Sequence, residues 1–151
     1  MIVEQNFEEF VRLLNEFKVR YLIVGAYAVG FHAEPRNTGD LDIWIEPVEE
    51  NADKMMNVLQ AFGMEGLTIT VEDFLSPEVV IQLGVPPVRI DILTTLSGLS
   101  FPEAYQARLT GKFGSTTMEF ISLDDLIKNK EATGRARDIA DVELLKNYRS
   151  K

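Results

Sequence analysis

The spacing of apolar and polar residues predicts a strand, a turn, a helix and a second strand at residues 20–46. The run at 20–24 is rich in aromatic and β-branched side chains, which predicts a buried strand that ends at Gly25. Small residues then predict a short helix packed close to the sheet. Glu34-Pro35 ends this helix, because the residue before a proline is disfavoured in helical conformation. Polar and apolar residues alternate at 40–45, the period of a strand with one buried face.

The rest of the chain continues this mixture of helix and strand patterns and predicts one α+β domain over residues 1–151. We expect a small, mixed, mostly antiparallel sheet of about four to six strands, with helices mainly on one face. A helical C-terminal extension at residues 122–148 is expected to close one side of a cleft. Glycine and prolines between residues 79–83 and 88–93 predict an antiparallel hairpin. The other expected elements are helices at 7–17, 47–62, 71–75, 102–109, 123–133 and 135–148, and strands at 67–70 and 116–121.

Composition and charge exclude several classes of protein. No cysteine is present, which excludes disulfides, cysteine nucleophiles and thiolate zinc sites. The single histidine, His32, lies near an expected helix end, where a packed ring is a commoner role than a catalytic one. The net charge of −9 disfavours broad binding to nucleic acid phosphates but permits a local basic patch. The longest apolar run, residues 21–31, is too short to span a bilayer and no signal peptide pattern is seen, so we expect a cytoplasmic protein.

Two carboxylates, Asp40 and Asp42, share one face of the strand expected at 40–45. Like charges at this spacing repel each other, and aspartate is disfavoured in strands, so a compensating group is expected. Solvent around an exposed start of the strand, an arginine or a divalent cation could each compensate the two charges. Carboxylate oxygens are the ligands that magnesium prefers. From these residues alone, the solvated strand start and the metal site are both open.

A third acid, Asp91, has apolar residues on both sides in an expected strand, and such an acid also requires a partner. Side chains at successive strand positions face opposite ways, and on that ground we predict that Arg89 is a poor partner for Asp91. Farther along, the expected last helix carries Arg137, Asp138 and Asp141. These charges either pair on an ordinary solvated helix surface, the role that we expect for Arg135 and Asp141 individually, or face the cleft.

Taken in chain order, these motifs resemble the DNA polymerase β-type nucleotidyltransferase superfamily. The resemblance is closest to its small bacterial branch of minimal nucleotidyltransferases and abortive-infection toxin-type proteins. The matching pieces are Gly25-Ala26 after an apolar strand, RNTGDLD at residues 36–42 and RIDI at residues 89–92. Lys130-Glu131-Ala132, followed by the charged residues at 135–141, resembles a late motif of the toxin-type branch. The superfamily has glycine or serine where this chain has Ala26, which lacks a hydroxyl and cannot adopt the positive φ open to glycine.

The resemblance implies transfer of a nucleoside monophosphate from an NTP to a hydroxyl of a small molecule, a protein side chain or an RNA end. Two Mg²⁺ ions, or Mn²⁺ in their place, would activate the acceptor hydroxyl and neutralise the triphosphate. The implied catalytic residues and metal ligands are Asp40, Asp42 and Asp91. The implied nucleotide and phosphate contacts are Gly25, Ala26 and Lys130, and the residues implied to brace the metal-bearing loop are Arg36 and Thr38.

Two other functions remain open at this point. One is a non-catalytic or regulatory nucleotidyltransferase homologue that acts as a partner in a toxin–antitoxin-type pair. Ala26 and the small size agree with this alternative, whereas the presence of all three acids argues against it. The other is a plain α+β domain with solvated acids. Among acceptors, RNA is mildly disfavoured by the acidic charge balance.

Overall fold

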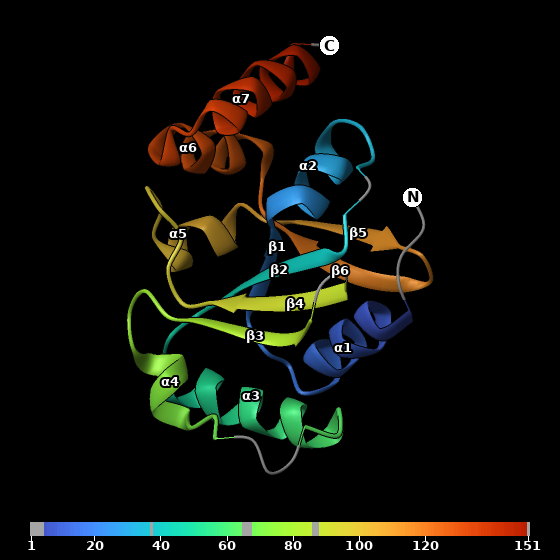
Figure 1. Ribbon diagram of the computed structural model, residues 1–151, viewed down its shortest axis with the longest axis vertical. Helices are drawn as coiled ribbons and strands as arrows, with labels where there is room; N and C mark the ends of the chain where they lie inside the picture. Colours follow the sequence, from blue (N-terminus) through green and yellow to red (C-terminus); the bar gives the residue numbers. More distant parts are fainter. Residues whose placement is uncertain (1–4, 37, 65–67, 86–87, 151) are drawn as a thin grey trace.

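The protein forms a six-stranded mixed sheet with helices on both sides in the computed structural model (Figure 1). The structure describes residues 5–36, 38–64, 68–85 and 88–150. The strands are β1 (Tyr21–Val24), β2 (Asp40–Ile45), β3 (Val80–Val85), β4 (Val88–Leu93), β5 (Leu109–Phe113) and β6 (Thr116–Phe120), in the sheet order β3-β4-β2-β1-β6-β5. Pairs β1/β2, β3/β4 and β5/β6 are antiparallel, whereas β2/β4 and β1/β6 are parallel. The predicted mixed, mostly antiparallel sheet and its β3/β4 hairpin are confirmed.

Seven helices are seen in the described part of the chain, and most begin and end close to the predicted residues. The Ser122 hydroxyl accepts a hydrogen bond from the Asp125 backbone N–H at 3.2 Å, which caps the sixth helix where the sequence predicts a cap. The helices are α1 (Gln5–Glu16), α2 (Gly25–His32), α3 (Glu49–Ala61), α4 (Val71–Leu75), α5 (Phe101–Gln106), α6 (Leu123–Thr133) and α7 (Ala136–Arg149).

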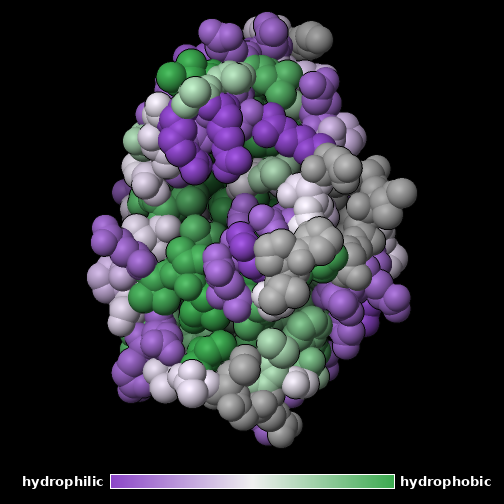
Figure 2. All heavy atoms as spheres, viewed as in Figure 1, coloured by the Kyte–Doolittle hydropathy of each residue, from purple (hydrophilic) through white to green (hydrophobic). Residues whose placement is uncertain are grey.

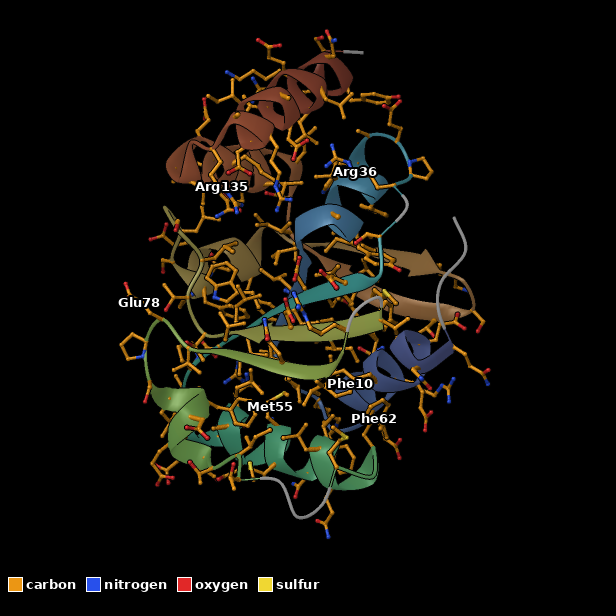
Figure 3. The ribbon with its side chains drawn as sticks, viewed as in Figure 1. Phe10, Arg36, Met55, Phe62, Glu78 and Arg135 are labelled. Carbon is orange, nitrogen blue, oxygen red and sulfur yellow. The ribbon has the colours of Figure 1, made fainter. Side chains whose placement is uncertain are left out.

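Both faces of the sheet are covered, so the expectation of helices mainly on one face is wrong in this detail. One buried layer joins α1, α3 and α4 to alternate strand residues such as Ile23 and Ile43. Phe10 and Met55 lie in this layer, in the lower part of Figure 3. A second layer joins α2, α5, α6 and α7 to the opposite strand face, which includes Leu22. Because β1 is apolar on both sides, each face needs its own cover.

The strand β5 and the segment before α4 differ from the sequence prediction. Residues 109–113 form an edge strand where a helix was predicted to continue to residue 109. Its pairing with β6 follows from the Gly114-Ser115 turn, a hairpin signal that was present in the sequence. No strand forms at residues 68–70, and residue 67, with which that predicted strand began, lies outside the described residues.

The C-terminal helical segment, α6 and α7, lies on the same side of the sheet as α2, at the top of Figure 1. It packs through Leu126, Val142 and Leu145 into the same apolar layer as Ala28 of α2. The predicted helical C-terminal segment is therefore confirmed. Within the described residues, no helix is both long enough and apolar enough to cross a membrane.

Candidate active site

The three predicted acids meet at one place because β2 and β4 run parallel and side by side. In this pairing Asp42 lies opposite Asp91, and Asp40 lies opposite Arg89. Residues two apart on a strand share a face, so all four side chains lie on the same side of the sheet. The structure thus brings together two segments that are about fifty residues apart in the chain.

Arg89 is a close partner of Asp91, which corrects the sequence prediction. Its Nε donates to Asp91 Oδ1 at 2.8 Å, and its terminal amino group donates to Asp91 Oδ2 at 3.1 Å. The same amino group lies 3.4 Å from Asp40 Oδ2. The prediction was wrong because positions 89 and 91 are two apart rather than successive, so their side chains face the same way. An arginine therefore compensates part of the acid cluster.

Gly25 turns the chain directly beside this cluster. Its φ is +66°, in the left-handed region that favours glycine, and a Cβ placed there would lie 2.1 Å from Asp42 Oδ2. Only a residue without a side chain allows this close approach of the turn to the carboxylate. Ala26, the next residue, lies in helix α2 and is not among the residues with positive φ, so alanine fits the backbone there.

The surroundings of Asp42 disfavour the charged form of its carboxyl group. Burial raises the pKa of Asp42 to about 7, and repulsion from Asp91 and Asp40 adds to the rise. Arg89 and Lys130 act in the opposite direction but do not restore the ordinary value. Near neutral pH, Asp42 therefore exchanges between its protonated and ionised forms, whereas a bound cation would favour the ionised form.

The loop before β2 is held by hydrogen bonds to α7, to β4 and within the loop itself. Arg36 donates two hydrogen bonds to the Asp141 carboxylate of α7, one of them at 3.3 Å. The Thr38 hydroxyl accepts from the Asp40 backbone N–H at 3.2 Å, and the Gly39 carbonyl accepts from the Arg89 backbone N–H at 2.8 Å. Arg36 and Thr38 thus have the contacts of bracing residues. Asn37, part of the sequence motif, lies outside the described residues.

A cavity of about 360 Å³ lies between the acid cluster and the C-terminal helices. Figure 2 shows this region as a hollow with hydrophilic residues above and below it. Figure 3 shows Arg36 beside α2 and Arg135 at the C-terminal helices, and both residues line the cavity. The predicted site residues that line it are Gly25, Ala26, Arg36, Thr38, Asp40, Asp42 and Lys130.

Lys130 enters this cavity from α6 as part of a buried ion-pair network. Its Nζ lies 3.0 Å from Asp141 Oδ2 and 3.5 Å from Asp138 Oδ1. Hydrogen bonds from Arg135 and Thr133 hold the pKa of Asp138 well below its usual range. Burial opposes ionisation of Asp141, but hydrogen bonds from Arg36 and Lys130 outweigh it and lower its pKa. The solvated helix surface expected for Asp141 is therefore wrong, because its carboxylate is buried at the cavity and paired with Arg36 and Lys130.

His32 has a packed environment rather than a place in the acid cluster. Its Nε2 lies 2.6 Å from the Ile121 carbonyl oxygen, and its ring packs edge-on against Phe31. Burial lowers the pKa of His32, so the ring is neutral at physiological pH. This agrees with the structural role that the sequence favoured.

The chain is similar in fold to several solved nucleotidyltransferases, although no family model and no curated protein matches its sequence. The lincosamide antibiotic adenylyltransferase LnuA, solved with lincomycin bound, has a TM-score of 0.62 and 17% identity, over 97% of this chain and 98% of that chain. The antibiotic-resistance factor ANT(2'')-Ia has a TM-score of 0.58 and 13% identity, over 94% of this chain and 81% of that one. A putative nucleotidyltransferase from Thermotoga maritima has a TM-score of 0.58 and 13% identity, over 95% and 90%.

The chain has the nucleotidyltransferase fold. The fold that the sequence resemblance implied is therefore confirmed, and the likeness in fold extends over nearly the whole chain. The comparisons do not distinguish the toxin-type branch within it.

The nucleotidyltransferase fold implies a metal site, and the chemistry of the acid cluster fits one. Asp40, Asp42 and Asp91 supply hard oxygen donors, and burial together with repulsion from the other two acids raises the pKa of Asp42. However, no group of three acidic or histidine side chains in the described part of the chain is already arranged to hold a metal ion. The Arg89 guanidinium donates to both oxygens of Asp91. The acids would have to release this arginine to act as three metal ligands.

Proposed function

We propose that the protein is a metal-dependent nucleotidyltransferase that moves a nucleoside monophosphate from an NTP to a hydroxyl. The observation that carries this proposal is the parallel register of Asp42 and Asp91, with Asp40 on the same face and the Gly25 turn beside them. Asp40 and Asp42 line the cavity, and Asp91 lies beside Asp42 on the neighbouring strand. Burial of Asp42 and repulsion from the other two carboxylates raise its pKa, a perturbation typical of functional sites.

The reaction joins the acceptor oxygen to the α-phosphorus of the NTP and breaks the bond between that phosphorus and the oxygen that leaves with pyrophosphate. Divalent cations held by Asp40, Asp42 and Asp91 would neutralise the triphosphate and lower the pKa of the acceptor hydroxyl. The hydroxyl proton passes to Asp91 as the acceptor oxygen attacks. Arg89, which donates to both oxygens of Asp91, would have to release this carboxylate for the step.

The opposite side of the cavity would position the nucleotide. The backbone N–H groups of Gly25 and Ala26 open helix α2, where the helix dipole and the free N–H groups favour phosphate oxygens. Lys130 lines the same cavity from α6 and adds a positive charge that Asp141 orients. Arg36 and Thr38 would hold the loop that carries Asp40.

A small-molecule hydroxyl is the acceptor class with most support. Two of the similar structures are an antibiotic adenylyltransferase bound to lincomycin and an antibiotic-resistance factor. The net charge of −9 gives no long-range attraction for RNA. A hydroxyl on a protein side chain is the remaining alternative.

A second candidate function is a non-catalytic homologue that binds a partner protein, as in a toxin–antitoxin-type pair. The observation that favours it is the two-pronged hydrogen bond of Arg89 to Asp91, which compensates this acid without a metal ion. In that case Arg89 would take the place of the metal ion permanently. The protein would keep the nucleotidyltransferase fold but would not catalyse nucleotidyl transfer.

Calorimetric titration with Mg²⁺ and each of the four common NTPs separates the two candidates. On the catalytic proposal, NTP binding requires the divalent ion and is lost in Asp40→Asn, while the exposed Asp53→Asn on α3 binds normally. In Asp91→Asn, transfer to an acceptor falls by orders of magnitude. Nucleotide binding that is equally strong without divalent ions, or no binding, would instead support the regulatory homologue.

A further inference from the structure

Four basic side chains line the cavity, and three of them are already committed to carboxylates. They are Arg36, Lys130, Arg135 and Arg137. Arg36 is bound to Asp141, Arg135 donates to Asp138 at 2.7 Å, and Lys130 lies between these two acids. Arg137 differs from the others. In the described part of the chain, it makes no hydrogen bond and no ion pair, although it lies at the cavity.

The carboxylates that bind Arg36, Lys130 and Arg135 are buried. Asp138 has no exposed surface and Asp141 is 5% exposed, and each accepts from more than one donor. Turning one of these cations toward a ligand would break a hydrogen bond or ion pair to a buried carboxylate, which costs free energy. Arg137 has no such constraint. Its guanidinium can move to a ligand without breaking any contact.

We propose that Arg137 is the residue that recognises the polyphosphate end of the NTP, an inference that rests on the nucleotidyltransferase function proposed above. Arg137 lies in the first turn of α7, where the helix dipole adds positive potential. Asp40 and Asp42 line the same cavity from β2. A nucleotide with its metal-bound phosphates near the two acids would extend its outer phosphates toward the C-terminal helices.

The chemistry of Arg137 suits this ligand better than that of Lys130. A guanidinium presents a planar fork of donors that matches two phosphate oxygens at once, and it is always charged. The ammonium of Lys130 is shared between Asp138 and Asp141, so less of its charge is available to a ligand. Among the cations that line the cavity, Arg137 alone therefore contributes an uncompensated charge. It would distinguish a triphosphate from a monophosphate.

The test is calorimetric titration of the wild type, Arg137→Gln and Arg12→Gln with Mg²⁺ and three probes. The probes are the NTP that binds the wild type most tightly, the corresponding nucleoside monophosphate, and inorganic tripolyphosphate. Arg12 is the matched control, because it is an exposed arginine on α1, on the other face of the sheet. Since Arg137 makes no contact that the fold needs, Arg137→Gln is expected to keep the melting temperature of the wild type.

We expect Arg137→Gln to bind the NTP and tripolyphosphate at least about ten-fold more weakly, the loss of one hydrogen bond to a charged group. Its affinity for the monophosphate should stay the same, and Arg12→Gln should match the wild type throughout. Equal NTP affinity in Arg137→Gln and Arg12→Gln would overturn the role of Arg137. A loss for the monophosphate as large as that for the triphosphate would overturn it too, because the arginine would then contact the base or sugar. A wild type that binds neither NTP nor tripolyphosphate would overturn the proposed function itself.

Discussion

Arg89 holds Asp91 with two hydrogen bonds, at 2.8 and 3.1 Å, from the same strand. The third acid of the cluster is therefore compensated by a neighbour that is only two residues away. Asp91 is 8% exposed, and a carboxylate so buried is unfavourable unless it is paired. The pair allows the strand to carry an acid in an apolar setting, and it also places a positive charge where a divalent cation would bind.

Replacing Arg89 by glutamine is expected to tighten metal binding. The substitution removes a cation that competes for the oxygens of Asp91 and lies 3.4 Å from Asp40. We expect the affinity for Mn²⁺ to rise roughly ten-fold, since the removed charge is close to the ligands and only partly screened. The variant should melt at a lower temperature than the wild type without a divalent ion, because Asp91 is then unpaired. Added Mn²⁺ should restore its melting temperature.

Arg108→Gln provides the control for this experiment. Arg108 pairs with Glu119 at 3.0 Å near the other edge of the sheet, so the variant also loses an arginine–carboxylate pair. It should bind Mn²⁺ as the wild type does. If Arg89→Gln binds Mn²⁺ no more tightly than Arg108→Gln, the arginine does not compete with a cation.

A methyl group at position 25 is expected to disrupt the site. In Gly25→Ala, the new Cβ would lie 2.1 Å from Asp42 Oδ2, and the backbone would keep a φ of +66°. We expect a loss of about 2–4 kcal/mol in the free energy of unfolding, from left-handed strain and from overpacking together. Because Asp42 must move, metal-dependent nucleotide binding should also be lost. Urea unfolding and calorimetry measure the two effects.

Gly63→Ala separates backbone strain from the contact with Asp42. Gly63 has a φ of +91°, but a Cβ there would meet no atom within 4 Å. We expect this variant to lose only about 1–2 kcal/mol, the cost of a left-handed alanine, and to keep nucleotide binding. Equal behaviour of the two alanine variants would show that the space beside Asp42 is unimportant.

Stability is expected to fall as the pH rises toward neutral because of Asp42. Its pKa is about 7 in the folded protein and about 3.8 when unperturbed. Between these values the folded state binds a proton that the unfolded chain has released, so raising the pH favours unfolding. Asp42→Asn cannot ionise and removes this dependence. Above pH 7 it should be more stable than the wild type by about 1–3 kcal/mol.

Urea unfolding of both proteins at pH 5 and pH 8 without divalent ions measures this difference. The comparison with the wild type cancels contributions from other groups that titrate in the same range. An advantage of Asp42→Asn that is the same at both pH values would contradict the raised pKa. With Mg²⁺ present, the wild type should recover stability at pH 8, because the cation favours the ionised carboxylate.

Local patterns in the chain predicted much of this architecture. The Ser122 cap and the helix after it, the β3/β4 hairpin and the alternation that puts Asp40 and Asp42 on one face depend on neighbouring residues. Strand β5 was missed, although the Gly114-Ser115 turn signalled it, because Gly111 weakens its strand pattern. Gly111 is needed for packing against Phe31, because a Cβ at this position would lie 2.4 Å from a ring carbon of Phe31.

The amino-acid order by itself determined the superfamily fold, the three acids and the glycine turn beside the first two of them. Only the tertiary structure decided how their charges are compensated. The parallel pairing of β2 with β4 brings Arg89 between Asp40 and Asp91, and the packing of α7 against α6 and α2 commits Arg36, Lys130 and Arg135 to buried carboxylates. The physical reason is the distance along the chain over which each effect acts. Periodicity and turn chemistry act over a few residues, whereas an ion pair depends on which distant segments the fold places within about 4 Å of each other.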